Sequence, residues 1–452
     1  MTEKKEVTMA EQRIRQLLDY GSFMEIGEAV TARLTDFYTP GTQDKPSDGV
    51  ITGYGTIDGQ LVYVFSQDVA VLGGTYGEMH GQKINRLYQM AMKTKAPIIG
   101  FLDCHGFRIE EGLDSLDKFA RLYALQAQAS GLIPQIMAVV GRCGGGMSIA
   151  ANMADFVFVE KENGRLFLNP GNAIDRSFDE IVDQADFTDA RMSCDEILES
   201  IRTLIHTLLP ANTSRRPRQK PCSDDLNRLC PGIAEKTGDG RAILQDISDD
   251  GFFFETRRDS GADMVTGFIM LDGIVVGAVA NQKTRNGLRR ISAEGFDKAA
   301  AFIEICDKFS FPILTLTDTE GFDTSEEQEI YLPKAAGRMI KALTRASMPK
   351  VNLITGEIYG SAYSIMNSKG LGADLVFMWD TANVNLINPR QAVEILYPHA
   401  DSALIEQRAA DYEKSHSSAR ALARHDYVDK VIRPEETRKY IAGAFETFAN
   451  LY

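Results

Sequence analysis

Short apolar runs alternate with amphipathic segments along this chain. The runs PIIGFLD (97–103) and PQIMAVVG (134–141) are almost wholly apolar, which is typical of strands buried in a parallel sheet. Residues 82–92 carry apolar side chains at positions 84, 87, 88 and 91, the spacing of one helix face. Residues 49–68 predict two strands that meet at Asp58 and Gly59. Strands that alternate with helices in this way indicate an α/β fold with a parallel sheet.

The whole pattern occurs twice. PIIGFLD matches PILTLTD (312–318), and PQIMAVVG matches PKVNLITG (349–356), both at an offset of 215 residues. Three further pairs of blocks follow the same order: GYGTIDG (53–59) with GFIMLDG (267–273), RCGGGMSIAAN (142–152) with EIYGSAYSIMN (357–367), and ADFVFV (154–159) with ADLVFM (373–378). Matched blocks of this length predict a tandem pair of similar domains rather than a solenoid. We place the boundary in the proline-rich, basic segment 210–225, which gives domains 1–225 and 226–452.

Each half ends two of its buried strands in a glycine-containing turn. DCHGF (103–107) and DTEGF (318–322) follow the first strand, and GRCGGG (141–146) and YGSA (359–362) follow the second. Sites in parallel sheets gather beyond the carboxyl ends of the strands. Glycines there let backbone N–H groups approach a ligand closely. Two interpretations stay open, namely tight packing of helix on strand, or donors for an oxyanion worth roughly 2.7–4 kcal/mol each.

Composition and motifs narrow the class of protein. The chain has 452 residues and a net charge of −14, which argues against bulk binding of nucleic acid or anionic membranes. No apolar run reaches the ~18 residues of a membrane span, and the N-terminus lacks the apolar region of a signal peptide. Six scattered cysteines without a CxxC pair favour reduced thiols and no metal site. GRCGGGMS also fails the P-loop and GxGxxG patterns. We therefore expect a cytoplasmic protein.

Longer blocks carry a family resemblance. GYGTIDGQLVYVFSQDVAVLGGTYGEMHGQKI in the first half and DKAAAFIEICDKFSFPILTLTDTEGF in the second resemble biotin-dependent acyl-CoA carboxyltransferases. This family is that of propionyl-CoA carboxylase β chains and of the carboxyltransferase subunits of biotin-dependent decarboxylases. The resemblance runs from about Ile14 to Phe448, with a gap near 170–225. It implies a tandem duplication of two crotonase-like domains with the ββα-superhelix fold, in agreement with the repeat.

The resemblance implies a reaction with two ligands. The N-terminal domain would bind an acyl-CoA such as propionyl-CoA or acetyl-CoA, and the C-terminal domain would bind biotin on a separate carrier protein. A carboxyl group would move between carboxybiotin and the acyl α carbon, through enolate and ureido oxyanions held by backbone amides. By matched position, the amides for the thioester are those of Gly106, Phe107, Gly145 and Gly146, and those for biotin are Gly321, Phe322, Gly360 and Ala362.

The resemblance also implies partners. It predicts a homo-oligomer, a hexamer, in which sites form between the N-half of one subunit and the C-half of another. This sequence contains no biotinyl-lysine motif and no ATP-grasp segment, so a biotin carboxyl carrier protein and a biotin carboxylase or membrane decarboxylase subunit would be separate chains. The same chemistry would also serve decarboxylation of malonyl-CoA or methylmalonyl-CoA. Two competing hypotheses are a crotonase-type hydratase or hydrolase using Glu110 or Glu111, and a catalytically silent scaffold.

Some positions depart from the family pattern or stay ambiguous. CHGFRIEEG (104–112) stands where the family usually has SGGARIQEG, so His105 and Phe107 crowd the first turn. GFDTS (321–325) replaces GFLPG. Lys83 and Arg108 are candidate contacts for CoA phosphates, or merely solvated cations. Glu327 would either tune acyl or biotin selectivity or only favour the dipole of a helix N-terminus.

Overall fold

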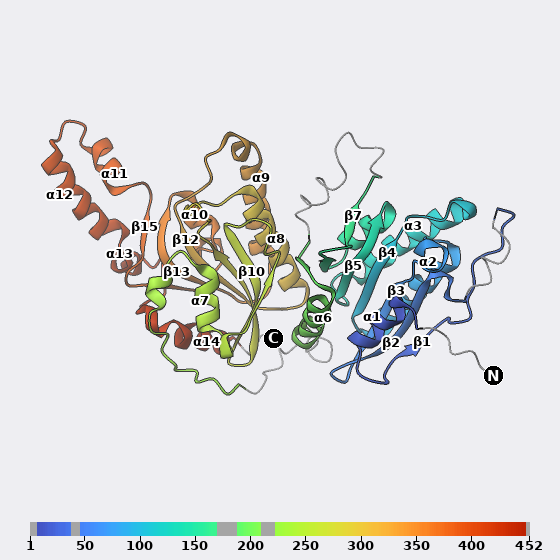
Figure 1. Cartoon of the computed structure of the whole chain (residues 1–452). Coiled ribbons are helices and arrows are strands. Elements are labelled where there is room, and N and C mark those ends of the chain that lie inside the picture. The colour runs from blue at the N-terminus through green and yellow to red at the C-terminus, as the bar shows by residue number, and fades with distance from the viewer. Residues whose placement is uncertain (1–6, 38–45, 170–187, 209–221, 449–452) are drawn as a thin grey trace. The chain divides into compact units, whose positions relative to one another are not determined.

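The computed structural model describes residues 7–37, 46–169, 188–208 and 222–448. The chain folds as two compact units, Met1–Asn212 and Thr213–Tyr452 (Figure 1). This boundary falls inside the expected segment 210–225 but earlier than the expected domain end at residue 225. Asp225 packs with the second unit, because the Arg438 Nε–H donates to its carbonyl oxygen over 3.1 Å.

The first unit is built on an eight-stranded mixed sheet. Its strand order is β1-β2-β3-β4-β5-β6-β8, and β7 pairs with β5. The hairpin β2–β3 is antiparallel, and β3, β4, β5, β6 and β8 pair in parallel. The strands are β1 (Met24–Glu25), β2 (Val50–Ile57), β3 (Gln60–Gln67), β4 (Ile98–Cys104), β5 (Gln135–Gly144), β6 (Phe156–Glu160), β7 (Arg165–Phe167) and β8 (Ala190–Met192). The predicted hairpin at Asp58-Gly59 and the predicted parallel sheet are both confirmed.

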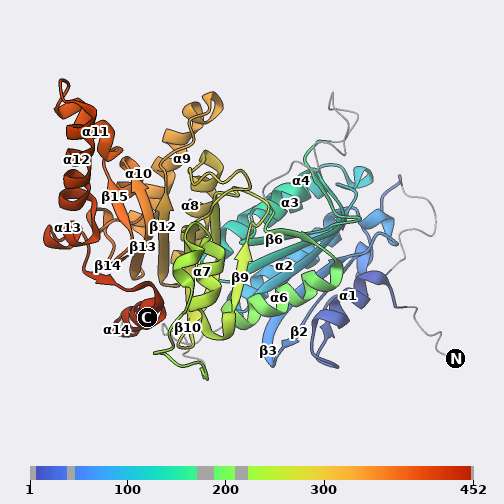
Figure 2. The same ribbon diagram turned by 60° about the vertical axis from the view of Figure 1, so that its left-hand side comes forward.

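Helices cover this sheet as the apolar spacing predicts. The predicted helix around residues 82–92 is α2, which buries Ile84, Leu87, Tyr88 and Ala91. It packs beside α3, while α1 and α6 contact each other (Figure 2). The helices are α1 (Met9–Leu17), α2 (Glu78–Thr94), α3 (Leu113–Ala129), α4 (Gly146–Asn152) and α6 (Cys194–Leu208), with short 3₁₀ turns η1 (Pro46–Gly49), η2 (Leu72–Gly74) and η3 (Ile109–Glu111).

The second unit repeats this topology strand for strand. Its sheet has the order β16-β14-β13-β12-β11-β10-β9, with β15 paired to β13 as β7 is to β5. The strands are β9 (Phe253–Thr256), β10 (Met264–Leu271), β11 (Ile274–Asn281), β12 (Ile313–Thr319), β13 (Lys350–Tyr359), β14 (Leu375–Trp379), β15 (Asn383–Asn385) and β16 (Lys430–Ile432). The tandem duplication predicted from the five sequence blocks is therefore confirmed.

The helices of the second unit include one group that matches no helix among the described residues of the first. The helices are α7 (Gly240–Ile247), α8 (Ala293–Lys308), α9 (Glu326–Arg345), α10 (Ser361–Ile365), α11 (Pro389–Leu396), α12 (Ser402–Tyr412), α13 (Ala419–Arg424) and α14 (Thr437–Thr447), with short turns η6 (Ile233–Lys236), η7 (Asp249–Gly251), η8 (Lys369–Leu371), η9 (Glu413–Ser417) and η10 (Pro434–Glu436). Both views show α11 and α12 projecting from the sheet. No residue of α12 is buried within the described chain. No helix in the described part is long and apolar enough to cross a membrane.

The repeat extends further than the sequence blocks indicated. The Arg202 guanidinium on α6 donates to the Leu17 carbonyl at the end of α1 and pairs with Asp19. In the second unit, Arg438 on α14 donates to the Ile247 carbonyl at the end of α7 and pairs with Asp249. The pairs β8–α6 and β16–α14 are thus equivalent. Part of the segment 170–205 that no sequence block covered is therefore a regular part of the fold.

Candidate active site

The first feature of the site is a matching irregularity in both sheets. The ladder between β4 and β5 runs regularly to Leu102 and Val139, then resumes at Cys104 and Cys143. The ladder between β12 and β13 shifts in the same way, from Thr317 and Ile354 to Thr319 and Ile358. In each unit the second strand therefore carries extra residues just before its glycine turn.

A buried aspartate fills each irregularity. A Cβ on Gly141 would lie 2.0 Å from the Asp103 carboxylate, and a Cβ on Gly356 would lie 2.4 Å from that of Asp318. Only glycine leaves room for the carboxylate at these two positions. Burial raises the pKa of both aspartates, while the backbone N–H of Arg142 or of Glu357 stabilises the ionised form. The aspartates thus hold two neighbouring strand ends together, which explains why the pentapeptide begins with Asp in both halves.

The first turn has the same backbone path in both units. Gly106 has φ +110° and Gly321 has φ +107°, values that favour glycine. The Gly106 carbonyl accepts the Tyr76 N–H over 2.8 Å, and the Gly321 carbonyl accepts the Ile291 N–H over 3.0 Å. These contacts pair Tyr76 with Phe107 and Ile291 with Phe322 in parallel bridges.

In a parallel bridge one residue makes both hydrogen bonds, and the N–H of the opposite residue points away from it. Here Tyr76 and Ile291 make both hydrogen bonds. The N–H groups of Phe107 and Phe322 therefore face away from Tyr76 and Ile291. Their side chains differ in environment. Phe107 is 48% exposed, whereas Phe322 is partly buried, with its ring centroid 6.0 Å from that of Phe296. The two turns thus present an equivalent amide under different surroundings.

The second turn corrects part of the prediction. Gly145 has φ +60° and ψ −132°, and Gly360 has φ +60° and ψ −142°, so the two backbones match. However, the Gly145 N–H donates to the Phe167 carbonyl over 3.1 Å, and the Gly360 N–H donates to the Asn385 carbonyl over 2.8 Å. These two N–H groups are therefore engaged by the residues at the ends of β7 and β15. Gly145 and Gly360 allow the positive φ that this turn requires before α4 and α10.

The next two residues in each turn begin the following short helix, α4 or α10. The first N–H groups of a helix have no acceptor within the helix. In the first unit these belong to Gly146, which was predicted, and to Met147, which was not. In the second unit they belong to Ser361, which was not predicted, and to Ala362, which was. The structure makes Gly146 equivalent to Ser361 and Met147 equivalent to Ala362.

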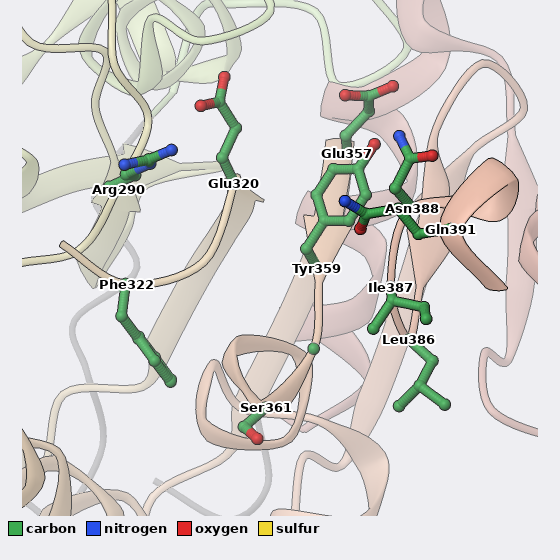
Figure 3. A pocket seen from close by; sticks show the side chains of 11 residues that line it. Arg290, Glu320, Phe322, Glu357, Tyr359, Ser361, Leu386, Ile387, Asn388 and Gln391 are labelled. Carbon is green, nitrogen blue, oxygen red and sulfur yellow. The ribbon is translucent and has the colours of Figure 1, made fainter. Parts of the chain in front are cut away.

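In the second unit both turns line one pocket of about 730 Å³. Figure 3 shows Phe322 and Ser361 at one end of the pocket and Glu320, Glu357 and Tyr359 at the other. Leu386 and Ile387, which follow β15, form an apolar side. The complete lining is Arg290, Glu320, Phe322, Glu357, Tyr359, Gly360, Ser361, Leu386, Ile387, Asn388 and Gln391. The lining of the pocket therefore combines residues of both turns, an apolar side and polar side chains.

Lys83 does not lie free on the surface for a phosphate. Its side chain is buried, and its Nζ donates to the Ser47 carbonyl over 3.0 Å and to the Val50 carbonyl. Lys298 occupies the matching position on α8 and donates to the Ser260 carbonyl over 2.9 Å. Because both units carry this buried lysine, its position indicates a structural role rather than recognition of one ligand.

Arg108 is also engaged in the fold. Its Nη1 donates to Asp48 Oδ1 over 2.6 Å and to Glu111 Oε1 over 2.9 Å, and its Nη2 donates to the Thr75 carbonyl. Arg108, Asp48 and Glu111 are all buried. Glu111, a candidate acid under the hydratase hypothesis, also accepts the Glu78 N–H at the start of α2. Arg108 and Glu111 thus connect the first turn to the start of α2 through hydrogen bonds.

The remaining candidate side chains are placed away from the amides or are unreactive. Glu327 is exposed in the first turn of α9 and does not line the second-unit pocket. Burial raises the pKa of Cys104 to about 11 and that of Cys143 well above its ordinary value, so both stay as thiols near neutral pH. Within the described residues, no group of three or more His, Cys, Asp or Glu side chains is arranged to hold a metal ion.

Both units therefore carry the same pair of turns, with backbone N–H groups at equivalent positions. A model of the carboxyl transferase domain matches residues 3–450. The chain belongs to this carboxyl transferase family. It is a carboxyltransferase of the propionyl-CoA carboxylase and transcarboxylase type, as the resemblance of its sequence blocks implied.

Similar proteins agree with this assignment. The propionyl-CoA carboxylase beta chain of Roseobacter denitrificans is 37% identical over 98% of this chain and 90% of its own length. The methylmalonyl-CoA decarboxylase subunit alpha of Propionigenium modestum is 33% identical over 96% of this chain and 89% of its own length. The crystal structure of transcarboxylase 12S, a hexamer with methylmalonyl-coenzyme A bound, has a TM-score of 0.90 at 29% identity and covers 98% of this chain and 90% of its own. The predicted tandem crotonase-like fold is thereby confirmed.

Several residues that support the turns were not predicted from the sequence. Asp103 and Asp318 were visible in the repeated pentapeptide, where only the glycine and phenylalanine were assigned roles. Arg13, 3.9 Å from Asp103, and Arg289, 2.6 Å from Asp318, gave no signal, because they come from different elements in the two units. Only the folded chain brings these arginines to equivalent carboxylates.

Proposed function

We propose that this carboxyltransferase moves a carboxyl group between biotin on a separate carrier protein and the α carbon of an acyl-CoA of the propionyl type. The first unit binds the acyl-CoA and the second binds biotin. The observation that supports this most directly is the duplicated pair of turns, with φ values of +110° and +107° at the first glycine and +60° at the second in both units. Two equivalent sets of amides suit a reaction in which two different oxygens gain negative charge.

Each set of amides would stabilise one oxyanion. In the first unit the N–H groups of Phe107, Gly146 and Met147 are the donors for a thioester oxygen. In the second unit those of Phe322, Ser361 and Ala362 are the donors for the ureido oxygen. Each donor is worth roughly 2.7–4 kcal/mol of transition-state stabilisation in comparable enzymes. Their rigid placement by Asp103 and Asp318 keeps the cost of reorganisation small.

The second-unit pocket fits biotin in size and polarity. Its volume of about 730 Å³ lies within the usual range of small-molecule sites. Phe322, Leu386 and Ile387 offer apolar surface for a bicyclic ring, and the amides of the turns meet a carbonyl oxygen. When bound, biotin would carry the carboxyl group and exchange the α-proton, so no side chain of this chain has to act as acid or base.

Decarboxylation is the second candidate for the physiological direction. The relative from Propionigenium modestum, named methylmalonyl-CoA decarboxylase subunit alpha, shares 33% of its aligned residues with this chain. The same two sites serve both directions, because the reverse of carboxyl transfer to an acyl-CoA releases the carboxyl group from a malonyl-type thioester. Its partners would be a biotin carboxyl carrier protein with either a biotin carboxylase or a membrane decarboxylase subunit, at the cytoplasmic side.

A homo-hexamer is the proposed assembly. Transcarboxylase 12S, with a TM-score of 0.90 to this chain, is described as a hexamer. Several large apolar side chains directly after the first turn are exposed in the isolated chain, among them Ile109 at 80% and Leu113 at 79%. Exposed apolar groups of this size in one short segment favour burial against another protein surface.

The proposal is tested by incubating the purified full-length protein with malonyl-CoA or methylmalonyl-CoA, with and without free biotin. We expect biotin-dependent loss of at least one thioester. Bound acyl-CoA without turnover of any malonyl-type thioester, in the presence of biotin and of a biotinylated carrier, would contradict the carboxyltransferase proposal and favour a silent scaffold. Turnover that does not depend on biotin would favour a hydrolase.

A further inference from the structure

The duplication gives the two sites equivalent backbone turns but side chains of opposite charge beside them. The residue before the turn glycine is His105 in the first unit and Glu320 in the second. The residue after the glycine that adjoins the buried aspartate is Arg142, after Gly141, in the first unit and Glu357, after Gly356, in the second. Both comparisons follow the 215-residue offset of the repeat and the matching irregularity of the strand ladders. We call these the wall pairs, His105–Arg142 and Glu320–Glu357.

The acidic wall pair lines the pocket of the second unit. Figure 3 shows Glu320 and Glu357 at the end of the pocket away from Phe322 and Ser361. Arg289 lies between them, with contacts of 3.4 Å to Glu320 and 3.5 Å to Glu357, and a closer contact of 2.6 Å to Asp318. The guanidinium is thus held mainly by Asp318, and the two glutamates keep side-chain exposures of 33% and 46%.

These two glutamates retain capacity for hydrogen bonds. An ionised carboxylate has about four acceptor positions and no donor. The long contacts to Arg289 occupy only part of that capacity, so the walls can accept N–H groups from a ligand. The turn amides at the other end of the pocket can only donate. A ligand that suits both ends therefore carries an oxygen acceptor flanked by N–H donors.

The basic wall pair has the opposite preference. His105 and Arg142 are both exposed. The Arg142 guanidinium lies 5.8 Å from the centroid of the Phe167 ring, and its backbone N–H holds the Asp103 carboxylate. The side chain is therefore anchored beside the Gly145 turn, whose N–H meets the Phe167 carbonyl. A guanidinium at this place favours a carboxylate or phosphate on the ligand.

We propose that the two wall pairs decide which ligand each site accepts. Glu320 and Glu357 take the N–H groups of a neutral cyclic urea whose oxygen lies at the second-unit amides. His105 and Arg142 take the free carboxylate of a malonyl-type CoA thioester whose thioester oxygen lies at the first-unit amides. This inference rests on the proposed function and assigns the discrimination within it to four named side chains.

The experiment exchanges one charge in each wall pair. The variants Glu357→Gln and Arg142→Gln of the full-length protein are compared for binding of three probes by titration calorimetry. The probes are biotinamide, which is a neutral urea, methylmalonyl-CoA, which carries the free carboxylate, and propionyl-CoA, which lacks it. Glu304→Gln serves as a control for net charge, since Glu304 is exposed on α8 and does not line the pocket.

We expect two opposite patterns. Glu357→Gln weakens biotinamide binding about tenfold and leaves both thioesters unchanged, because a charge-assisted hydrogen bond becomes a neutral one. Arg142→Gln weakens methylmalonyl-CoA about tenfold and leaves propionyl-CoA and biotinamide unchanged. The control binds all three probes as the native protein does. Since Glu357 and Arg142 are solvent-accessible, both variants should retain the native melting temperature.

Further outcomes separate the inference from the proposed function. If the native protein binds biotinamide and Glu357→Gln binds it equally well or better, the wall pairs do not select the ligands, while the proposed function stands. If Arg142→Gln weakens propionyl-CoA as much as methylmalonyl-CoA, Arg142 does not recognise the free carboxylate. If the native protein binds no biotinamide, the assignment of biotin to the second unit fails and the inference fails with it.

Discussion

Lys83 and Lys298 show how comparison of the two units helps to assign a role to a single residue. Each lies on the first helix after the hairpin of its unit, is buried, and donates to a backbone carbonyl of a preceding loop. From the sequence, Lys83 was a candidate for phosphate binding. The equivalent Lys298 lies in the unit proposed to bind biotin, which carries no CoA phosphate. The property that both lysines share is therefore the hydrogen bond to a backbone carbonyl, which indicates a structural role.

Lys298 should make stability depend on pH. Burial lowers its pKa from 10.5 to about 8. The unfolded chain, with the ordinary pKa, keeps the proton between pH 8 and 10.5 while the folded chain has lost it. The free energy of unfolding therefore rises across this window, by up to about 3 kcal/mol, and the full cost of the buried charge is present below pH 8.

The variant Lys298→Met isolates this contribution. We expect the melting temperature of the native protein to rise relative to that of the variant as the pH increases from 8 to 10.5. Differential scanning calorimetry of both proteins at several pH values measures the gain. A difference that stays constant with pH would mean that Lys298 titrates like an exposed lysine.

Arg108 should matter for stability rather than for affinity. Its guanidinium holds Asp48 and Glu111, and all three are buried. Arg108→Met leaves two buried carboxylates without their cation, which costs about 3–5 kcal/mol in comparable cases. Arg33→Met is the matched control. Arg33 pairs with Glu78 and Asp114 at the surface, where such pairs contribute about 0–1 kcal/mol.

Thermal unfolding of both arginine variants checks this expectation. A large fall in melting temperature for Arg108→Met, with a small one for Arg33→Met, would support the structural role. A native melting temperature with a raised KM for the acyl-CoA would instead restore Arg108 as a contact for the CoA phosphates.

At the scale of elements, the pair of turns in each unit carries the proposed site. Each depends on a strand irregularity, a buried aspartate and two glycines with positive φ. The strands and helices around them follow from apolar spacing, and α2 and the hairpin β2–β3 lie where that spacing predicted. The choice of donor amides did not follow, because it depends on whether β7 or β15 already takes the glycine N–H.

Substitution of Gly145 and Gly360 should lower turnover more than stability. A Cβ on Gly145 meets no atom within 4 Å, and one on Gly360 meets only the Leu386 carbonyl at 3.6 Å. The strain therefore comes from φ +60° and would be relieved by rotation of the turn. Since the following amides move with it, we expect Gly145→Ala and Gly360→Ala each to lower kcat about 10²-fold.

Gly59→Ala is the control for these turn variants. Gly59 has φ +75° and open space around it in the β2–β3 hairpin. Its substitution introduces a similar backbone strain outside the site, so kcat should stay at the native value while the melting temperature falls slightly. Equal losses of kcat in all three variants would mean that general destabilisation, not displacement of the amides, lowers turnover.

At the scale of the whole molecule, the second unit contains the helices α11, α12 and α13, which match no helix in the described part of the first unit. The repeated part includes the arginines Arg202 and Arg438, each of which joins a late helix to the end of an early one. The duplication thus preserves the backbone conformation of the turns in both units.

The proposed hexamer gives a prediction at this scale. Leu113 is 79% exposed near the first turn, so Leu113→Glu should place a charge in a subunit contact. We expect light scattering after gel filtration to give the mass of six chains for the native protein and a smaller assembly for the variant. Leu132→Glu, at a 40% exposed position after α3, is the control and should stay hexameric. A hexameric Leu113→Glu variant would exclude this segment from the interface.

The sequence by itself determined the α/β class, the duplication and the four turns, because strand periodicity, helix periodicity and glycine at positive φ are local properties of the chain. It also suggested the family through co-ordered blocks. Only the tertiary structure decided that Lys83 and Arg108 are internal, that β7 and β15 take the amides of Gly145 and Gly360, and that Arg13 and Arg289 serve equivalent aspartates. The physical reason is that a hydrogen bond or an ion pair depends on which distant groups the fold brings within reach, and no local pattern specifies that partner.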